Sequence, residues 1–182
     1  MSGPMTGVKV VELGVWIAGP ATGGILADWG ADVVKIEPPS GDPARLFQKI
    51  LGGDLPTNPV FELDNRSKRS IALDLSGEGG REVLRRLLEG ADVLLENFKT
   101  GTLEKWGMGY EQTLAREFPR LIHLRISGFG ADGPLGGYPG YDAVVQACAG
   151  LISINGSAGA EPVRMGIPMV DLGTGLIAVN GI

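Results

Sequence analysis

Residues 8–37, VKVVELGVWIAGPATGGILADWGADVVKIE, decide the fold. Residues 8–13 are apolar and rich in β-branched side chains, which predicts a buried strand. Pro20 suits the first turn of a helix and Gly30 suits its end. Residues 31–37 then predict a second strand. Because a short helical crossover joins parallel strands, this stretch indicates a βαβ unit in a parallel sheet.

The same pattern recurs along the chain. Residues 76–89 predict a helix with Ser76 as its cap, and residues 91–96 predict a strand. A further helix is expected before Pro119, followed by a strand over residues 121–127. Strands that alternate with helices predict an open α/β sheet.

Two turn-rich stretches, residues 38–69 and 128–140, interrupt this alternation. Loops at the carboxyl ends of parallel strands are where α/β proteins hold ligands. Helices are expected over residues 141–154 and 171–182. Because no stop signal follows the last of these helices, we expect a chain that belongs to a longer protein.

Composition excludes several classes of protein. The chain is 43% hydrophobic and 20% charged, and its net charge of -5 argues against a nucleic-acid-binding protein. Cys148 is the single cysteine, which excludes an internal disulfide, and its apolar surroundings predict a small buried side chain. With no signal-peptide pattern and no membrane-length apolar stretch, a cytoplasmic protein without a membrane partner is expected.

Two other site types lack their motifs. The first loop, residues 14–19, follows the first predicted strand. The glycines in and after it do not have the G-x-G-x-x-G spacing of a dinucleotide site, which disfavours an oxidoreductase. His123, the only histidine, lies in a predicted strand and is expected to be structural. No metal-ligand spacing and no G-x-S-x-G hydrolase motif is present, so no metal is expected.

Two features allow either a functional or a structural interpretation. The basic residues Arg66, Lys68 and Arg69 could form a solvated surface or contact a phosphate-rich ligand. Asp171 follows an apolar run and precedes a helix, where an aspartate often acts only as an N-cap. A helix N-terminus also favours an ionised carboxylate, and Gly173 and Gly175 leave space near it, so Asp171 could be a nucleophile.

Long motifs carry a family resemblance. They are residues 7–42, NRSKRSIALDL (65–75), ADVLLENFKTGTLEKWGMGYE (91–111), SGFGADGPLGGYPGYDAVVQACAGL (127–151) and GIPMVDLGTG (166–175). Together they resemble the class III CoA-transferases of the formyl-CoA and carnitine CoA-transferase type. The resemblance implies a Rossmann-like sheet with helices on both faces. It places residues 1–182 in the N-terminal part of the large CoA-binding domain, without the family's small domain and C-terminal return.

The resemblance also implies the site residues and the chemistry. It makes Asp171 the catalytic nucleophile, with coenzyme A or acyl-CoA as a substrate rather than a tightly bound cofactor. Transfer of CoA to a small carboxylic acid then passes through aspartyl anhydride and aspartyl-CoA thioester intermediates. The implied substrate-binding residues are Ile17, Ala18, Leu73, Asn97, Phe98, Lys99, Lys105, Tyr141 and Asp142.

Departures from the family's patterns bear on the alternatives. Formyl-CoA transferases have glutamine in place of Ile17, and this departure argues against an oxalate-type substrate. They have arginine in place of Pro38, so one contact to the nucleotide end of CoA is not expected here. The family's 2-methylacyl-CoA racemases have histidine in place of Tyr141, so a racemase is disfavoured. A module that binds CoA without turnover is a further alternative. The family forms interlocked homodimers, so residues 1–182 alone are expected to be inactive.

Overall fold

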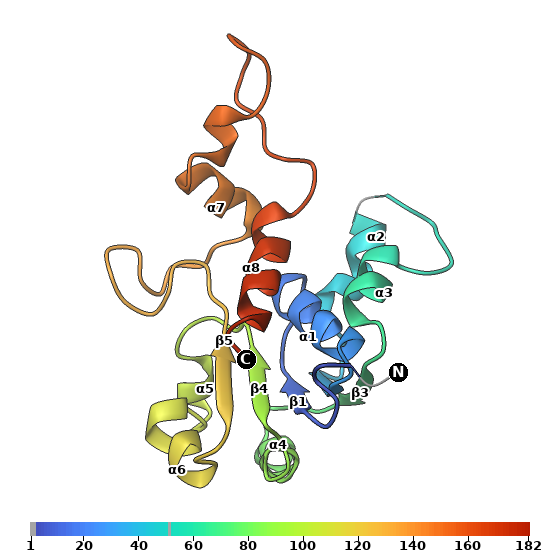
Figure 1. Cartoon of the computed structure of the whole chain (residues 1–182), viewed down its shortest axis with the longest axis vertical. Coiled ribbons are helices and arrows are strands. Elements are labelled where there is room, and N and C mark those ends of the chain that lie inside the picture. Colours follow the sequence, from blue (N-terminus) through green and yellow to red (C-terminus); the bar gives the residue numbers. More distant parts are fainter. Residues whose placement is uncertain (1–2, 51) are drawn as a thin grey trace.

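A computed structural model describes residues 3–50 and 52–182 of the chain. Five parallel strands form one sheet in the order β3-β2-β1-β4-β5 (Figure 1). This is the strand order of the first five strands of a Rossmann fold, with its switch point between β1 and β4. The strands are β1 (Lys9–Glu12), β2 (Asp32–Glu37), β3 (Arg69–Ala72), β4 (Val93–Glu96) and β5 (Ile122–Arg125). The predicted open parallel sheet is confirmed.

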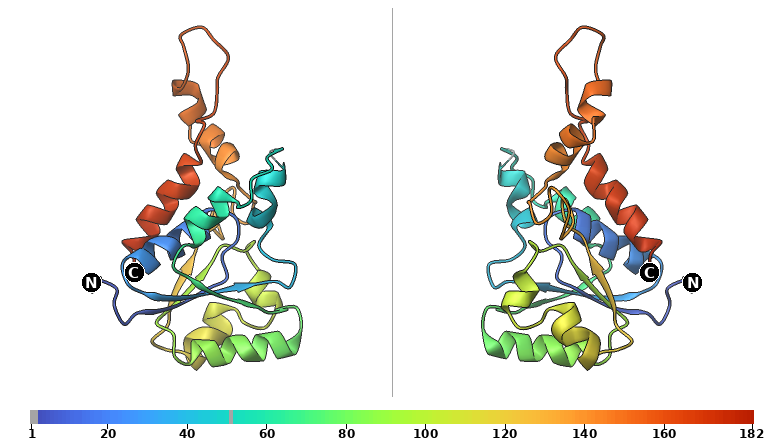
Figure 2. Two further views of the ribbon diagram at one scale, coloured as in Figure 1. Left: turned by 90° about the vertical axis from the view of Figure 1, so that its right-hand side faces the viewer. Right: turned by 90° about the vertical axis from the view of Figure 1, so that its left-hand side faces the viewer.

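Alternating side chains of the central strands build a core on each face of the sheet. Val10 of β1 packs into the core that includes Leu26, while its neighbour Val11 packs into the core that includes Leu84 and Leu88. This alternation follows from the period of two in a strand. Figure 2 shows helices above and below the sheet, which confirms that both faces are covered.

The helices divide between the two faces. Helices α1 and α8 pack together on one face, and α4 and α5 contribute leucines to the core on the other. The α-helices are α1 (Ala18–Asp28), α2 (Phe47–Ile50), α3 (Pro59–Asn65), α4 (Glu78–Leu88), α5 (Thr102–Lys105), α6 (Ala115–Glu117), α7 (Asp142–Cys148) and α8 (Met169–Val179). Shorter turns of 3₁₀ or π helix are η1 (Pro43–Leu46), η2 (Tyr110–Leu114) and η3 (Leu151–Ile154).

The turn-rich stretch 38–69 has more structure than the sequence indicates. It contains η1, α2 and α3, and the edge strand β3 begins at its end. Asn58 caps α3 by accepting a hydrogen bond from the Phe61 N–H at 3.2 Å. Leu51, within this stretch, lies outside the described residues. The helix expected at residue 76 begins at Glu78, because Ser76 donates its hydroxyl to Asp74 instead of capping the helix.

The helix expected over residues 141–154 is wrong in its length. Helix α7 ends at Cys148, and Gly150 then adopts a φ of +79°, a left-handed conformation that ends helices. In Figure 1 the segment from α7 through η3 extends away from the sheet before the chain returns in α8. Cys148 is exposed on this segment, so the expectation of a buried cysteine is also wrong. Among the described residues, no helix combines the length and apolar character that a membrane crossing requires.

Candidate active site

A cavity of about 360 Å³ opens at the switch point of the sheet. Residues 15–18 after β1, 97–100 after β4 and 126–128 after β5 form its floor. Residues 137–141, Val145 of α7 and the residues Val170, Asp171 and Thr174 of α8 form the remaining wall. Loops from the carboxyl ends of several strands therefore converge where parallel α/β sheets bind ligands.

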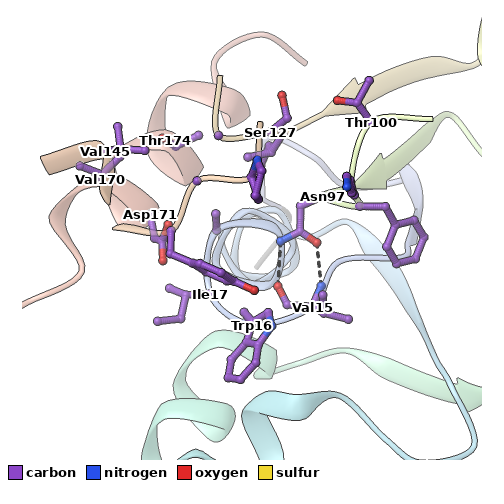
Figure 3. Close-up of a pocket in the computed structure, with 18 of the residues that line it drawn as sticks. Val15, Trp16, Ile17, Asn97, Thr100, Ser127, Val145, Val170, Asp171 and Thr174 are labelled. Carbon is purple, nitrogen blue, oxygen red and sulfur yellow. Dashed lines mark hydrogen bonds between the residues drawn. The ribbon is translucent and has the colours of Figure 1, made fainter. Parts of the chain in front are cut away.

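Asp171 lies in the first turn of α8 and faces this cavity (Figure 3). The helix begins two residues earlier than expected, so Asp171 is not its N-cap. Oδ1 of Asp142 accepts hydrogen bonds from the main-chain N–H groups of Val170, at 2.7 Å, and Asp171, at 3.2 Å. Asp142 therefore takes the capping role from outside the helix, where its carboxylate satisfies two amides that lack intrahelical partners.

The electrostatics of Asp171 differ from the expectation for a helix N-terminus. Burial, the larger cause, and the neighbouring charge of Asp142 together raise the pKa of the Asp171 carboxyl to about 6. The expectation of an unusually favoured carboxylate is therefore wrong, because desolvation outweighs the helix dipole. Asp171 is still largely ionised at neutral pH, and it is more basic than an exposed aspartate.

The two glycines after Asp171 have different roles. A Cβ atom on Gly173 would meet nothing within 4 Å, as expected for open space beside a substrate. A Cβ on Gly175 would lie 3.3 Å from Oγ1 of Thr22 and 3.4 Å from the carbonyl oxygen of Ala18. Gly175 therefore lets α8 approach α1 closely, and the expectation that it keeps space open for a substrate is wrong.

Asn97 joins the first loop to the loop after β4. Its Oδ1 accepts the Val15 N–H and its Nδ2 donates to the Val15 carbonyl oxygen, both at 2.8 Å (Figure 3). The side-chain amide of Asn97 thus contacts the protein's own main chain, while the residue still lines the cavity. The adjacent Trp16 has a φ of +63°, which is rare for a large side chain.

The other residues implied by the resemblance fall into two groups. Five of them line the cavity together with Asp171 and Asn97: Ile17, Ala18, Phe98, Lys99 and Tyr141. Three do not line it: Leu73, Lys105 and Asp142. Leu73 packs against the core beneath α4, and Lys105 is an exposed residue at the end of α5.

The basic residues after α3 are engaged within the protein. Arg66 pairs with Asp28, and Arg69 pairs with Asp32 at 2.7 Å. Lys68 is buried and lies 2.8 Å from Oε2 of Glu12. Lys68 therefore belongs neither to a solvated surface nor to a phosphate site, because an intramolecular ion pair holds its ammonium group.

His123 belongs to a structural cluster on β5. Its ring stacks on Tyr110 with the centroids 4.9 Å apart, and its Nε2 lies 3.4 Å from Oε1 of Glu96. Oε1 of Glu96 also accepts from Arg125 at 2.7 Å. Within residues 3–50 and 52–182, no group of three or more His, Cys, Asp or Glu side chains could hold a metal ion.

Sequence reasoning missed Trp16 and Asp42 at this site. Trp16 lines the cavity, and Oδ1 of Asp42 accepts its main-chain N–H at 3.1 Å. No local pattern could pair these two residues, because 26 positions separate them. The available signal was the position of Trp16 in a loop at the carboxyl end of a strand.

The fold and the carboxylate at the switch point define an α/β protein with a candidate nucleophile. The model of CoA-transferase family III matches residues 5–182, and the chain belongs to this family. The chain spans about half the length of the curated relatives that it matches.

Two relatives and one solved structure illustrate the similarity. The chain is 40% identical to the succinate–glutarate CoA-transferase of Agrobacterium fabrum, with 98% of the chain and 46% of the relative aligned. It is 40% identical to the acetyl-CoA:oxalate CoA-transferase of Acetobacter aceti, over 99% of the chain and 46% of the relative. The crystal structure of a CAIB/BAIF family protein from Brucella suis superposes with a TM-score of 0.91 at 41% identity, covering 100% of the chain and 48% of that protein.

Proposed function

We propose that the protein transfers CoA from an acyl-CoA to a carboxylic acid, with Asp171 as the nucleophile. The observation that carries this proposal is the half-buried Asp171 carboxylate, with a pKa of about 6, facing a cavity at the switch point. Such a group is ionised at neutral pH, and its raised basicity makes it a better nucleophile than an exposed carboxylate. The similarity to named CoA-transferases supports the same reaction.

The proposed chemistry moves CoA through the aspartyl side chain. An Asp171 oxygen attacks the thioester carbonyl carbon and the C–S bond breaks. CoA leaves as the thiolate, and the acyl group remains on Asp171 as a mixed anhydride. The thiolate attacks the aspartyl carbonyl of that anhydride, which gives an aspartyl-CoA thioester and the free donor acid. The acceptor carboxylate then attacks this thioester and releases the thiolate again. Attack of the thiolate on the acceptor carbonyl forms the new acyl-CoA and regenerates Asp171.

The cavity suggests where the parts of the substrate would lie. Lys99 is the exposed cation on its rim and suits a phosphate of CoA as a point-charge partner. The aromatic and aliphatic side chains of Trp16, Ile17 and Val145 line the cavity, as a thioester and acyl group require. Developing oxyanions need main-chain N–H donors, and the first turn of α1 beside Ile17 has no side-chain cap.

We further propose a homodimer of the whole protein, with residues 1–182 as the N-terminal part of its CoA-binding domain. Support comes from large apolar side chains exposed on the segment from α7 to α8. Ile154 is 80% exposed and Ile177 is 76% exposed, and large apolar side chains that are exposed in this way are typical of surfaces that another chain or another part of the protein covers. We also propose a cytoplasmic location and no nucleic-acid or membrane partner. The acidic net charge supports the absence of a nucleic-acid partner.

Mass spectrometry of the full-length protein with a panel of acyl-CoAs tests the reaction. A transferase gives an acyl or CoA adduct on the peptide that contains Asp171, and it forms new thioesters when carboxylic acids are added. A racemase instead incorporates deuterium at the acyl α-carbon without an adduct. A module that only binds CoA gives neither result, and either of these last two outcomes would overturn the proposal.

A further inference from the structure

A buried network of four charged side chains lies beneath the first loop of the cavity. Lys35 is 1% exposed, and its Nζ lies 3.1 Å from Oε1 of Glu12 and 2.9 Å from Oδ2 of Asp42. Lys68 completes the set through its 2.8 Å contact with Oε2 of Glu12. The two lysines and the two carboxylates balance in charge. Glu12 comes from β1 and Lys35 from the neighbouring strand β2.

This network holds the main chain that leads into α1. Lys35 donates to the Gly14 carbonyl oxygen at 2.6 Å, Asp42 accepts the Trp16 N–H at 3.1 Å, and Lys68 donates to the Pro20 carbonyl oxygen at 2.8 Å. These three contacts fall on seven consecutive residues, 14–20, of which residues 15–18 line the cavity. A buried ion pair stabilises a fold no more than well-packed apolar side chains would, because desolvation opposes the attraction, so a role in fixing a particular conformation is the better explanation here.

The conformation that needs fixing is that of Trp16. A residue with a side chain pays about 1–2 kcal/mol to adopt the left-handed region, and such residues persist only where their surroundings hold them. Trp16 has a φ of +63°. Its N–H bond to Asp42 and the two bonds between Val15 and Asn97 hold the loop from both sides.

We propose that Asp42, supported by Lys35, is a positioning residue that keeps Trp16 in the conformation competent to bind the CoA thioester. The inference rests on the proposed CoA-transferase function. Without Asp42, the Trp16 N–H loses the bond that holds it, and the population of the left-handed conformation is expected to fall roughly five- to thirty-fold. The apparent affinity for substrate then falls by the same factor, while kcat at saturation stays unchanged.

The test uses full-length Asp42→Ala, Asp42→Asn and, as a control, Asp32→Ala, which breaks an exposed ion pair with Arg69. Transfer from succinyl-CoA to glutarate gives KM and kcat, and calorimetry gives the Kd of CoA. Asp42→Ala should raise KM and Kd together by about ten-fold. Asp42→Asn keeps an oxygen for the Trp16 N–H and should lose less. A variant that merely destabilises the fold lowers kcat, through the active fraction, without changing KM, and that result would overturn the proposal.

A double-mutant cycle with Trp16→Gly tests the cause. Glycine adopts a positive φ without strain, so Asp42→Ala should have little further effect on KM in the Trp16→Gly background. An equal effect in both backgrounds would contradict the proposal even if one variant folds poorly.

Hydrogen exchange at the Trp16 amide measures the loop without using the reaction. Exchange should accelerate in Asp42→Ala and stay unchanged in Asp32→Ala. If exchange accelerates while KM and Kd do not change, Asp42 holds the loop without positioning substrate, and the inference fails. If the wild-type protein neither transfers nor binds CoA, the proposed function fails instead, whatever the exchange result.

Discussion

Replacement of Gly23 by alanine tests how tightly α1 packs on the buried charges. Gly23 lies in the interior of α1, where alanine ordinarily stabilises a helix by about 1 kcal/mol relative to glycine. Here a Cβ atom would lie 1.8 Å from Oε2 of Glu12 and 3.1 Å from Nζ of Lys68. The Glu12 carboxylate must therefore move, although it is fully buried between two lysines.

The expected loss of stability follows from these opposing effects. Disruption of a buried ion pair costs about 3–5 kcal/mol, and the helix propensity of alanine offsets about 1 kcal/mol. Gly23→Ala should therefore lower the free energy of unfolding by about 2–4 kcal/mol. The measurement is urea unfolding of the full-length protein, followed by circular dichroism.

Gly79→Ala is the matched control. Gly79 lies in α4, and a Cβ there would meet nothing within 4 Å. This variant should be as stable as the wild type or more stable, by up to about 1 kcal/mol. If Gly23→Ala were as stable as Gly79→Ala, the Glu12 carboxylate would have room to move, and the close packing of α1 on the buried charges would be disproved.

Three further predictions concern ionisable groups. The charge of Asp142 contributes to the raised pKa of Asp171, so Asp142→Asn should move the acidic limb of the kcat/KM–pH profile to a pH below about 6. An unshifted limb would show that the charge of Asp142 does not affect the titration of Asp171. Lys99→Ala should weaken CoA binding more than Lys105→Ala, most strongly at low salt, because Lys99 lines the cavity and Lys105 does not; equal Kd values would count against this placement. Burial raises the pKa of Asp64 to about 6, so its folded form binds a proton more tightly than the unfolded chain. Stability should therefore fall as pH rises from about 4 through 6, and Asp64→Asn should remove this dependence in unfolding experiments, whereas an unchanged pH profile would contradict it.

The parts of the fold with strong local signals were predictable from the sequence. The apolar strands β1, β2 and β4 stand out because the central strands of a parallel sheet are covered on both faces. Strand β3, RSIA, has no such signal, because it lies at the edge and all four of its residues are exposed. Its pairing with β2 depends on tertiary structure, which no local pattern carries.

The candidate site shows the same division. Asp171 could be chosen from its motif, but its raised pKa depends on burial in the folded protein and on Asp142, which lies 29 positions earlier in the sequence. The role of Lys68 was misjudged for a related reason. A lysine between two arginines suggests a charged surface, whereas its partner Glu12 belongs to a distant strand. Charged residues that are buried through long-range pairs cannot be distinguished from surface charges by sequence alone.

Trapping of the covalent intermediate identifies the nucleophile. The full-length protein and its Asp171→Asn variant are each incubated with succinyl-CoA, quenched in acid, digested and analysed by mass spectrometry. We expect the peptide containing Asp171 to gain the mass of CoA or of the acyl group in the wild type and to gain nothing in the variant, which also loses nearly all transfer. An adduct on another residue, or turnover that survives in Asp171→Asn, would show that Asp171 is not the nucleophile.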